Sequence, residues 1–429
     1  MTRLSKIQIY WSKGWQCMPA ITAFVITLHP RLSAFSLILW GIMAVVGGIV
    51  GQQQDKRNAT HSFIWSSLGP VLYFFGLALG MFWTKQMGVG WFALEVKSTL
   101  VILPVLFWLQ VRWSSNSDWI NWTVRAFLWG LGIFMVWRFL LAGWLGDSAL
   151  WRYDGLAGPF HPTYIAAYLT LGMFLMPHKS RWRKPFVVMA ALFIGLLASK
   201  AGWLVAFALL GFMLVLFKVR TARWDVAAGV AAIALVLGGG LGDQGRMQEF
   251  MGYAMHRTAL SQDEVTSDEE SAAGQYEGEA MVVNKPKKVG SSGGRMQAWR
   301  ASWILLKAHP FGVGTGDVVD ELVRIYALQN SDYALKIQMN PHSTYWQALV
   351  TLGWLGGVLL MLWFGGLFWD ACKGNALNLG VFAAIVLIHG VFESILELQQ
   401  GVVVWVFLGL LLSHQGKERL SQRPGDIDG

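Results

Sequence analysis

The stretch NPHSTYWQALVTLG, residues 340–353, places a histidine where a polar turn runs into an apolar, aromatic-rich segment. An imidazole with an ordinary pKa of about 6.5 is largely neutral at neutral pH and can accept a proton. His342 is therefore a candidate general base. Two other interpretations stay open: the ring could donate a hydrogen bond to an anion, or it could stand at the start of a helix for which Ser343 is the cap.

Other ionisable side chains lie near the ends of long apolar segments, on the side where the loop charges also place His342. They are Glu95, Lys97, Arg138, His161, Lys200, Glu393 and Glu397, with His389 one turn deeper. An ionisable residue within a membrane span costs about 2.5–3.5 kcal/mol on insertion scales. A single cation can snorkel to the headgroups, but carboxylates do so poorly. The set therefore indicates a polar chamber open to the outside, whose mixed charges could bind a phosphorylated lipid headgroup.

The elements that must position these side chains are membrane helices. Of the 429 residues, 55% are hydrophobic and 14% are charged, whereas soluble domains carry about 25% charged residues. We expect about twelve spans, at 17–29, 33–50, 63–83, 91–110, 121–143, 162–177, 185–199, 201–217, 225–241, 344–369, 378–397 and 401–413. The two cysteines, Cys17 and Cys372, cannot make a disulfide framework.

The positions of the basic residues predict the orientation. The net charge is +9, but the positive residues lie in short loops between spans, as the positive-inside rule requires, and not in one patch that would bind nucleic acid. Both termini are then cytoplasmic. Residues 1–241 hold spans one to nine, residues 242–343 form a large outer loop, residues 344–414 hold spans ten to twelve, and residues 415–429 are a cytoplasmic tail.

The outer loop changes character along its length. Residues 261–280 carry acidic residues and no basic ones, the composition of a flexible, solvated segment. Further on, helical spacing predicts a helix over 295–310 that ends at a proline. A glycine turn over 311–317 follows, and then a second helix over 317–329 with Asp317 as its candidate N-cap.

A transporter of a polar or lipid-linked solute is the alternative from another functional class. Transporters usually place ionisable residues near the membrane midplane, often in broken helices of two matched halves. Here the ionisable residues gather toward one side, and no half-repeat is visible in the sequence. The pattern favours chemistry at the outer face over transport through the bilayer.

Five segments together resemble the O-antigen ligase and O-antigen polymerase superfamily. In 340–353, a histidine and a serine are followed by nine residues and a glycine, which resembles the signature at the end of the large periplasmic loop in bacterial O-antigen ligases. Residues 294–317 are similar to that family's arginine- and tryptophan-containing helix and its Pro-x-Gly-x-Gly turn. Residues 158–169, 196–207 and 392–407 resemble further family segments, so the likeness covers spans six to twelve.

The resemblance implies an all-α polytopic membrane protein, a GT-C-type glycosyltransferase with its active site at the periplasmic face of the bacterial inner membrane. Ligases of this family move a glycan from undecaprenyl pyrophosphate to the lipid A-core, with inversion and without a metal or another cofactor. An O-antigen polymerase and a protein O-oligosaccharyltransferase use the same donor, and the sequence leaves both open. The expected partners are the donor, the acceptor and membrane lipids, with no nucleic acid.

The resemblance also assigns roles to residues. His342 is the expected catalytic residue, and Arg295 matches the loop arginine, whose planar fork would hold pyrophosphate. Lys200 stands at the family's other arginine, with the charge but without the fork, and Arg300 could assist. The residues expected to line the chamber are His161, Tyr164, Glu393 and Glu397. The outer loop has no paired Asp-x-Asp, so no metal site is expected.

Overall fold

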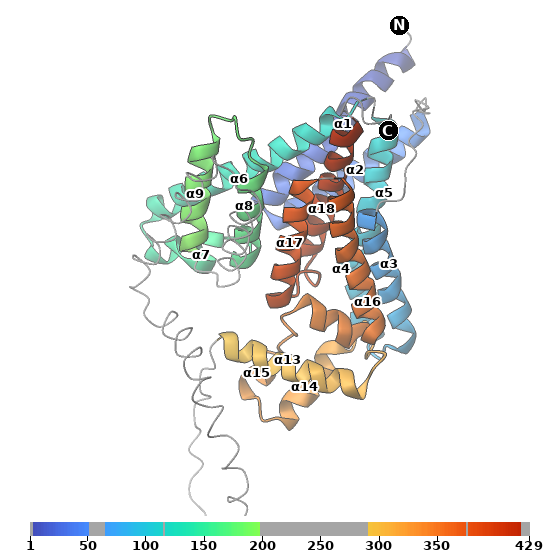
Figure 1. Ribbon diagram of the computed structural model, residues 1–429, viewed down its shortest axis with the longest axis vertical. Coiled ribbons are helices and arrows are strands. Elements are labelled where there is room, and N and C mark those ends of the chain that lie inside the picture. Colours follow the sequence, from blue (N-terminus) through green and yellow to red (C-terminus); the bar gives the residue numbers. More distant parts are fainter. Residues whose placement is uncertain (1–2, 51–64, 115, 198–290, 375, 422–429) are drawn as a thin grey trace, which may run out of the picture.

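The computed structural model describes residues 3–50, 65–114, 116–197, 291–374 and 376–421 (Figure 1). Every regular element in these ranges is a helix, which confirms the all-α expectation. Five helical stretches are long and apolar enough to cross a membrane: Pro30–Ile49, Trp65–Trp83, Met87–Trp113, Asp118–Leu145 and Thr344–Lys373. The spans expected at 201–217 and 225–241, like the acidic segment 261–280, lie outside the described residues. The total of twelve therefore stays a prediction.

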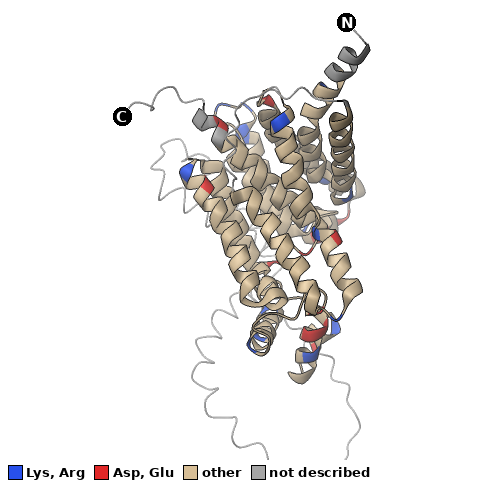
Figure 2. Cartoon of the chain, turned by 90° about the vertical axis from the view of Figure 1, so that its right-hand side faces the viewer, with Lys and Arg blue, Asp and Glu red and all other residues tan. Residues whose placement is uncertain are grey.

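Charged residues lie mainly toward the two ends of the bundle, with long uncharged stretches of helix between them (Figure 2). Figure 1 shows the start of the first helix and the end of the last at one end, and the helices of the outer loop at the other. This arrangement is that of a multi-pass helical membrane protein. Residues 291–343, called the outer segment below, lie at the end of the bundle opposite the termini.

Helix α1 (Arg3–Leu28) begins earlier than the span expected at 17–29. It packs along α6 (Asp118–Leu145). Its first half is too polar to be recognised as a span, but Trp11 and Trp15 are buried there and stack with ring centroids 5.3 Å apart. Tertiary packing of these two rings thus extends the helix beyond its apolar part.

The span expected at 91–110 is two helices, α4 (Met87–Lys97) and α5 (Thr99–Trp113). They meet at Ser98, whose backbone N–H donates to the carbonyl of Glu95 at 3.1 Å, an i to i−3 bond that tightens the last turn of α4. Helix α3 (Trp65–Gly80) precedes them and packs against α5. The break leaves Lys97 at the end of α4.

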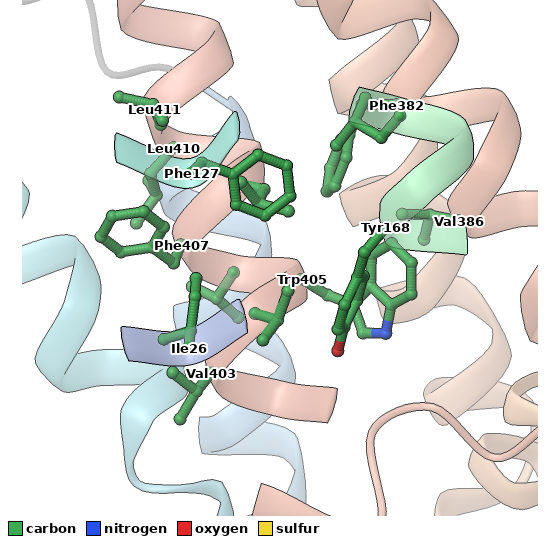
Figure 3. Packing of buried hydrophobic residues seen from close by; sticks show 14 of the residues in the cluster. Ile26, Phe127, Tyr168, Phe382, Val386, Val403, Trp405, Phe407, Leu410 and Leu411 are labelled. Carbon is green, nitrogen blue, oxygen red and sulfur yellow. The ribbon is translucent and has the colours of Figure 1, made fainter. Parts of the chain in front are cut away.

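Helix α18 (Gln399–Ser421) is the central helix of the bundle. From 401 to 413 every residue is buried, because α2 (Pro30–Val50), α3, α4, α5, α6, α16 and α17 all pack against it. A helix that is apolar on all sides is expected in the interior of a bundle. Trp405 and Phe407 of α18 meet Ile26, Phe127 and Phe382 from neighbouring helices (Figure 3).

The outer segment is a second, smaller core at one end of this bundle. Its helices are α13 (Ser291–Ala308), α14 (Val318–Leu328) and α15 (Asp332–Lys336), and α13 packs against α16. Ala298, Leu305, Leu322 and Tyr326 bury their side chains between them. The first two helices lie where the helical spacing predicts them, whereas α15 was not expected.

Helix α16 (Thr344–Lys373) is interrupted at Gly353, whose φ is +63°. The glycine turn that follows α13 crosses the helix there. Val313 and Gly314 donate their N–H groups to the carbonyls of Val350 and Thr351 at 2.9 and 3.0 Å, and Trp354 donates to the carbonyl of Pro310 at 3.1 Å. The glycine of the histidine-serine signature is thus the point where the outer segment is joined to a span.

Asp317 occupies the N-cap position of α14, as expected, but its side chain makes no capping hydrogen bond. Its buried carboxylate instead accepts from the backbone N–H groups of Lys85 and Gln86, both at 2.7 Å. The side-chain bond is absent because the turn that precedes α4 takes both carboxylate oxygens. The carboxylate joins the outer segment to the α3–α4 connection.

Replacing Asp317 with alanine should lower the free energy of unfolding by about 3 kcal/mol, because hydrogen bonds to a charged group contribute about 1.5–3 kcal/mol each and the backbone N–H groups of Lys85 and Gln86 both lose their acceptor. Thermal unfolding in detergent measures this loss. Asp320→Ala is the matched control, since that carboxylate is exposed and accepts from the Gln86 side chain at 3.1 Å. Equal melting temperatures for the two variants would contradict the assignment.

Candidate functional site

Helix α17 (Leu377–Phe392) ends five residues before the end of the span expected at 378–397. Glu393 is extended, and residues 393–398 form a non-helical loop before α18, called the 393–398 loop below. The first residue of α16, Thr344, forms hydrogen bonds with backbone groups of this loop. Thr344 donates its N–H and its hydroxyl to the carbonyl of Glu393 at 3.1 and 2.8 Å, and its hydroxyl accepts from Ile395 N–H at 3.0 Å. These bonds replace the ones that further helix would have made.

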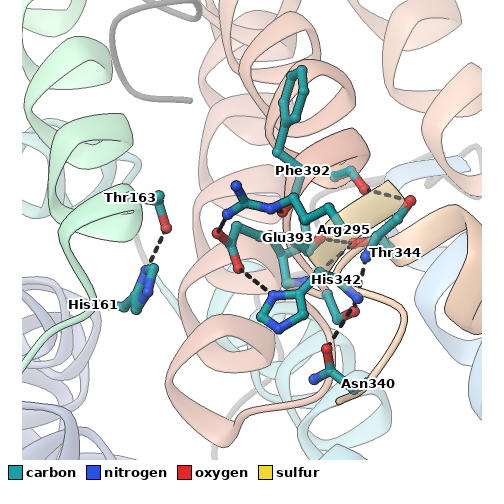
Figure 4. A network of polar contacts seen from close by, with 12 residues as sticks. His161, Thr163, Arg295, Asn340, His342, Thr344, Phe392 and Glu393 are labelled. Carbon is teal, nitrogen blue, oxygen red and sulfur yellow. Dashed lines mark hydrogen bonds and ion pairs between the residues drawn. The ribbon is translucent and has the colours of Figure 1, made fainter. Parts of the chain in front are cut away.

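The 393–398 loop brings a carboxylate between two of the predicted site residues (Figure 4). Glu393 Oε1 accepts from Arg295 Nη2 at 2.8 Å, and Arg295 Nε donates to the carbonyl of Phe392 at 3.1 Å. Glu393 Oε2 lies 3.7 Å from His342 Nδ1. Arg295 comes from α13, His342 from the turn before α16, and Glu393 from the loop after α17. Three distant segments thus supply a cation, an imidazole and the carboxylate that joins them.

His342 has a φ of +46°, a left-handed conformation that is uncommon for residues other than glycine. Asn340 supports it, because its side-chain oxygen accepts from His342 N–H at 2.9 Å and makes an Asx turn. Ser343 occupies the N-cap position of α16, as expected, but its hydroxyl donates to the carbonyl of Gly390 at 3.3 Å and makes no capping hydrogen bond. A side chain held in such a backbone conformation is typical of a functional position.

The charges around Glu393 keep it ionised. Burial favours the neutral carboxyl, but the contact with His342 and the charges of His161 and Arg295 outweigh it and lower the Glu393 pKa from 4.5 to about 2. A carboxyl whose pKa is depressed in the folded state contributes stability above its unfolded pKa. That contribution is lost as the pH falls from about 4.5 toward 2.

Replacing Glu393 with glutamine should therefore cost about 2 kcal/mol of stability at pH 7, the value of a hydrogen bond to a charged group. The difference in stability between the variant and wild type should shrink when the pH is lowered from 7 toward 3. Below about pH 4.5 the stability that the ionised Glu393 contributes to wild type is progressively lost. Melting temperatures of both proteins in detergent at the two pH values test this. A difference that is the same at both pH values would contradict the role of the carboxylate charge.

The residues expected to line the chamber fall into two groups. Glu397, at the other end of the 393–398 loop, pairs with Lys97 Nζ at 2.9 Å. His161 and Tyr164 lie at the start of α8 (Pro162–Leu175). His161 is to the left of Glu393 in Figure 4, and its Nδ1 is 2.7 Å from the hydroxyl of Thr163. Tyr164 is buried, and its ring centroid is 5.3 Å from that of His389.

The remaining cationic candidates are placed differently. Arg300 is exposed on α13, further along the helix than Arg295. Arg138, a weaker candidate, binds the backbone instead, with Nε donating to the carbonyl of Leu156 at 3.0 Å and Nη2 to that of Gly155. Lys200 lies outside the described residues.

Lys97 is the residue near the site whose role sequence reasoning missed. The sequence shows it as one ionisable side chain in an apolar segment, and so does Glu397. A lysine and a carboxylate that both need a partner inside a membrane protein are candidates for pairing with each other. That signal was available, although a separation of 300 residues hides it.

The fold and the site together define a class: a multi-pass helical membrane protein with a cation, an imidazole and a carboxylate gathered at the end of the bundle opposite its termini. Among the described residues, no group of three His, Cys, Asp or Glu side chains is placed to hold a metal ion. The profile of a family described as O-Antigen ligase matches residues 185–361 of the chain. This match confirms the resemblance to the O-antigen ligase-like superfamily, and it includes Arg295 and His342. No curated protein matches the chain.

Proposed function

We propose that this protein is a membrane glycosyltransferase that moves a glycan from undecaprenyl pyrophosphate to the lipid A-core. The observation that carries the proposal is the meeting of Arg295, His342 and Glu393, within a chain that has an O-antigen ligase family match. Glycosyl transfer from a lipid diphosphate needs a cation for the leaving group and a base for the acceptor hydroxyl. These three side chains supply both.

Arg295 is the residue proposed to hold the diphosphate. A guanidinium stays charged at any working pH, and its planar fork can donate to two phosphate oxygens at once. In the described structure Nε and Nη2 donate to the Phe392 carbonyl and the Glu393 carboxylate. A phosphate oxygen would therefore compete with Glu393 for the same nitrogen.

His342 is proposed to take the acceptor proton. Nδ1 faces Glu393, so Nε2 is the ring nitrogen free to face an acceptor hydroxyl. The acceptor oxygen attacks the anomeric carbon while the bond from that carbon to the diphosphate oxygen breaks. The bonding electron pair leaves with undecaprenyl pyrophosphate, the proton goes to His342, and the anomeric configuration inverts. The Glu393 carboxylate then stabilises the imidazolium.

The proposed location follows from the arrangement of the helices. α1 starts and α18 ends at the same end of the bundle, and the site lies at the other end (Figure 1). Because the basic loops predict cytoplasmic termini, we propose that the site faces the periplasm from the inner membrane. The GT-C-type architecture and metal-independent catalysis belong to the same proposal.

The test is transfer by the purified protein in lipid vesicles, with undecaprenyl-pyrophosphate glycan as donor and with a chelator in a parallel sample. Three acceptors are offered separately: lipid A-core, a second lipid-linked glycan, and an acceptor protein. Glycan joined to lipid A-core, with or without chelator, supports the proposal. Transfer only to the lipid-linked glycan would identify a polymerase, and transfer only to protein an oligosaccharyltransferase. An absence of donor consumption with all three would overturn it.

A further inference from the structure

The 393–398 loop makes a partly buried charge pair near each of its ends. Its first residue, Glu393, pairs with Arg295 of the outer segment. Its fifth, Glu397, accepts from Lys97 Nζ at 2.9 Å, and Lys97 ends α4 within the bundle. Only 4% of the Lys97 side chain and 24% of the Glu397 side chain are exposed. One short loop thus connects a span to the outer segment through two carboxylates.

A lysine as enclosed as Lys97 requires a counter-charge, because removing an ammonium group from water carries a large desolvation penalty. Lys97 ends α4, and Glu397 of the 393–398 loop supplies the charge. The loop has little other regular structure: Glu397 N–H donates to the carbonyl of Ser394 at 3.1 Å, and the next helix begins at Gln399. Leu396 is buried in the core, and the Lys97–Glu397 pair adds a charged contact between the second half of the loop and α4.

We propose that the Lys97–Glu397 pair is a positioning pair for the proposed transfer reaction. It fixes the 393–398 loop so that the Glu393 carboxylate stays between Arg295 and His342. Lys97 itself contacts Glu397 and acts on the site only through the loop. The expected effect on catalysis rests on the proposed function, whereas the effect on the position of Glu393 does not.

The main variant replaces both partners, Lys97→Met with Glu397→Gln, because removing a buried pair as a unit leaves no unpaired charge and preserves folding better than removing one partner. We expect a melting temperature close to that of wild type and a kcat about 10²-fold lower with little change in KM, the effect of a misplaced catalytic group. The single variant Lys97→Arg keeps the positive charge and the partner Glu397, and it should therefore keep most of the wild-type kcat.

A second measurement does not depend on transfer. Diethyl pyrocarbonate modifies neutral imidazoles, and mass spectrometry of the digested protein gives the rate at His342, whose side chain is 32% exposed. In the double variant the released loop should uncover His342 and raise the modification rate there. The single variant Lys97→Arg, which keeps Glu397, should show the wild-type modification rate. Lys85→Met is the matched control, because Lys85 pairs with Glu321 at 3.5 Å while 76% of its side chain is exposed. In Lys85→Met, neither the rate of glycan transfer nor the modification rate at His342 should change.

The two readouts separate the two proposals. If the double variant is folded and keeps both the wild-type kcat and the wild-type modification rate at His342, the pair does not position the loop. If the wild-type chain transfers no glycan, the proposed function fails. The modification rate then still decides whether Lys97 and Glu397 hold the loop, and an unchanged rate overturns that inference.

Discussion

His342→Ala is expected to insert and fold normally but to transfer glycan about 10²–10⁴-fold more slowly, the usual contribution of general acid–base catalysis. The imidazole is the group that we propose takes the acceptor proton, and Glu393 Oε2 lies 3.7 Å from its Nδ1. Initial rates of transfer from undecaprenyl-pyrophosphate glycan, measured at saturating acceptor, check this. Near-wild-type rates would remove the base assignment and leave His342 as a structural residue.

Two further variants distinguish the loss of the imidazole from a disturbance of the backbone. His342 has a positive φ, which alanine accepts less readily than asparagine. His342→Asn should therefore keep the turn and still lose the rate. His309→Ala is the matched control, because His309 is an exposed histidine just beyond the end of α13. A loss of rate in the control as large as that in His342→Ala would point to general disruption of the outer segment.

Gly353→Ala is expected to have the largest effect on folding, a loss of at least about 3 kcal/mol that places it among the more severe single substitutions. Gly353 has a φ of +63°, and a methyl group there would overlap the carbonyl oxygen of Pro310 and the backbone of Phe311. Neither obstacle is a flexible side chain that could move aside. Melting temperature in detergent and the yield of monodisperse protein measure the loss.

Gly365→Ala is the control for that experiment. Gly365 lies in the same helix, and a methyl group there meets no atom within 4 Å. This substitution should be neutral or slightly stabilising, since alanine favours a helix interior over glycine. Equal stability of the two variants would show that the crossing at Gly353 can relax, and the close approach of the Pro310–Gly314 turn would then not be essential.

The sequence predicts the parts of the fold that depend on local pattern. The helices near 295–310 and 317–329 are indicated by spacing and by the proline and glycines between them, and α18 by its unbroken apolar character. It does not predict where α17 ends. FESILELQQG keeps helical spacing of apolar residues, and the helix stops because the start of α16 offers better partners for the backbone at Glu393.

The site shows the same division between local and tertiary information. The residue types at His342 and Arg295 indicate a base and an anion-binding cation, and their motifs resemble those of a family. That both meet Glu393 depends on three segments folding together. Two other contacts are tertiary in the same way, and no spacing rule encodes them. Lys97 pairs with Glu397, and the Asp317 carboxylate accepts from the turn at Lys85 and Gln86.

The central position of α18 has a consequence for biosynthesis. Every helix that packs against it precedes it in the chain, so those helices enter the membrane before their shared neighbour has been made. Until then the surfaces that receive Trp405 and Phe407 face lipid or each other. The bundle therefore reaches its final arrangement only after translation of the last helix, and premature termination before that point should leave an inserted but unassembled protein that quality-control proteases remove.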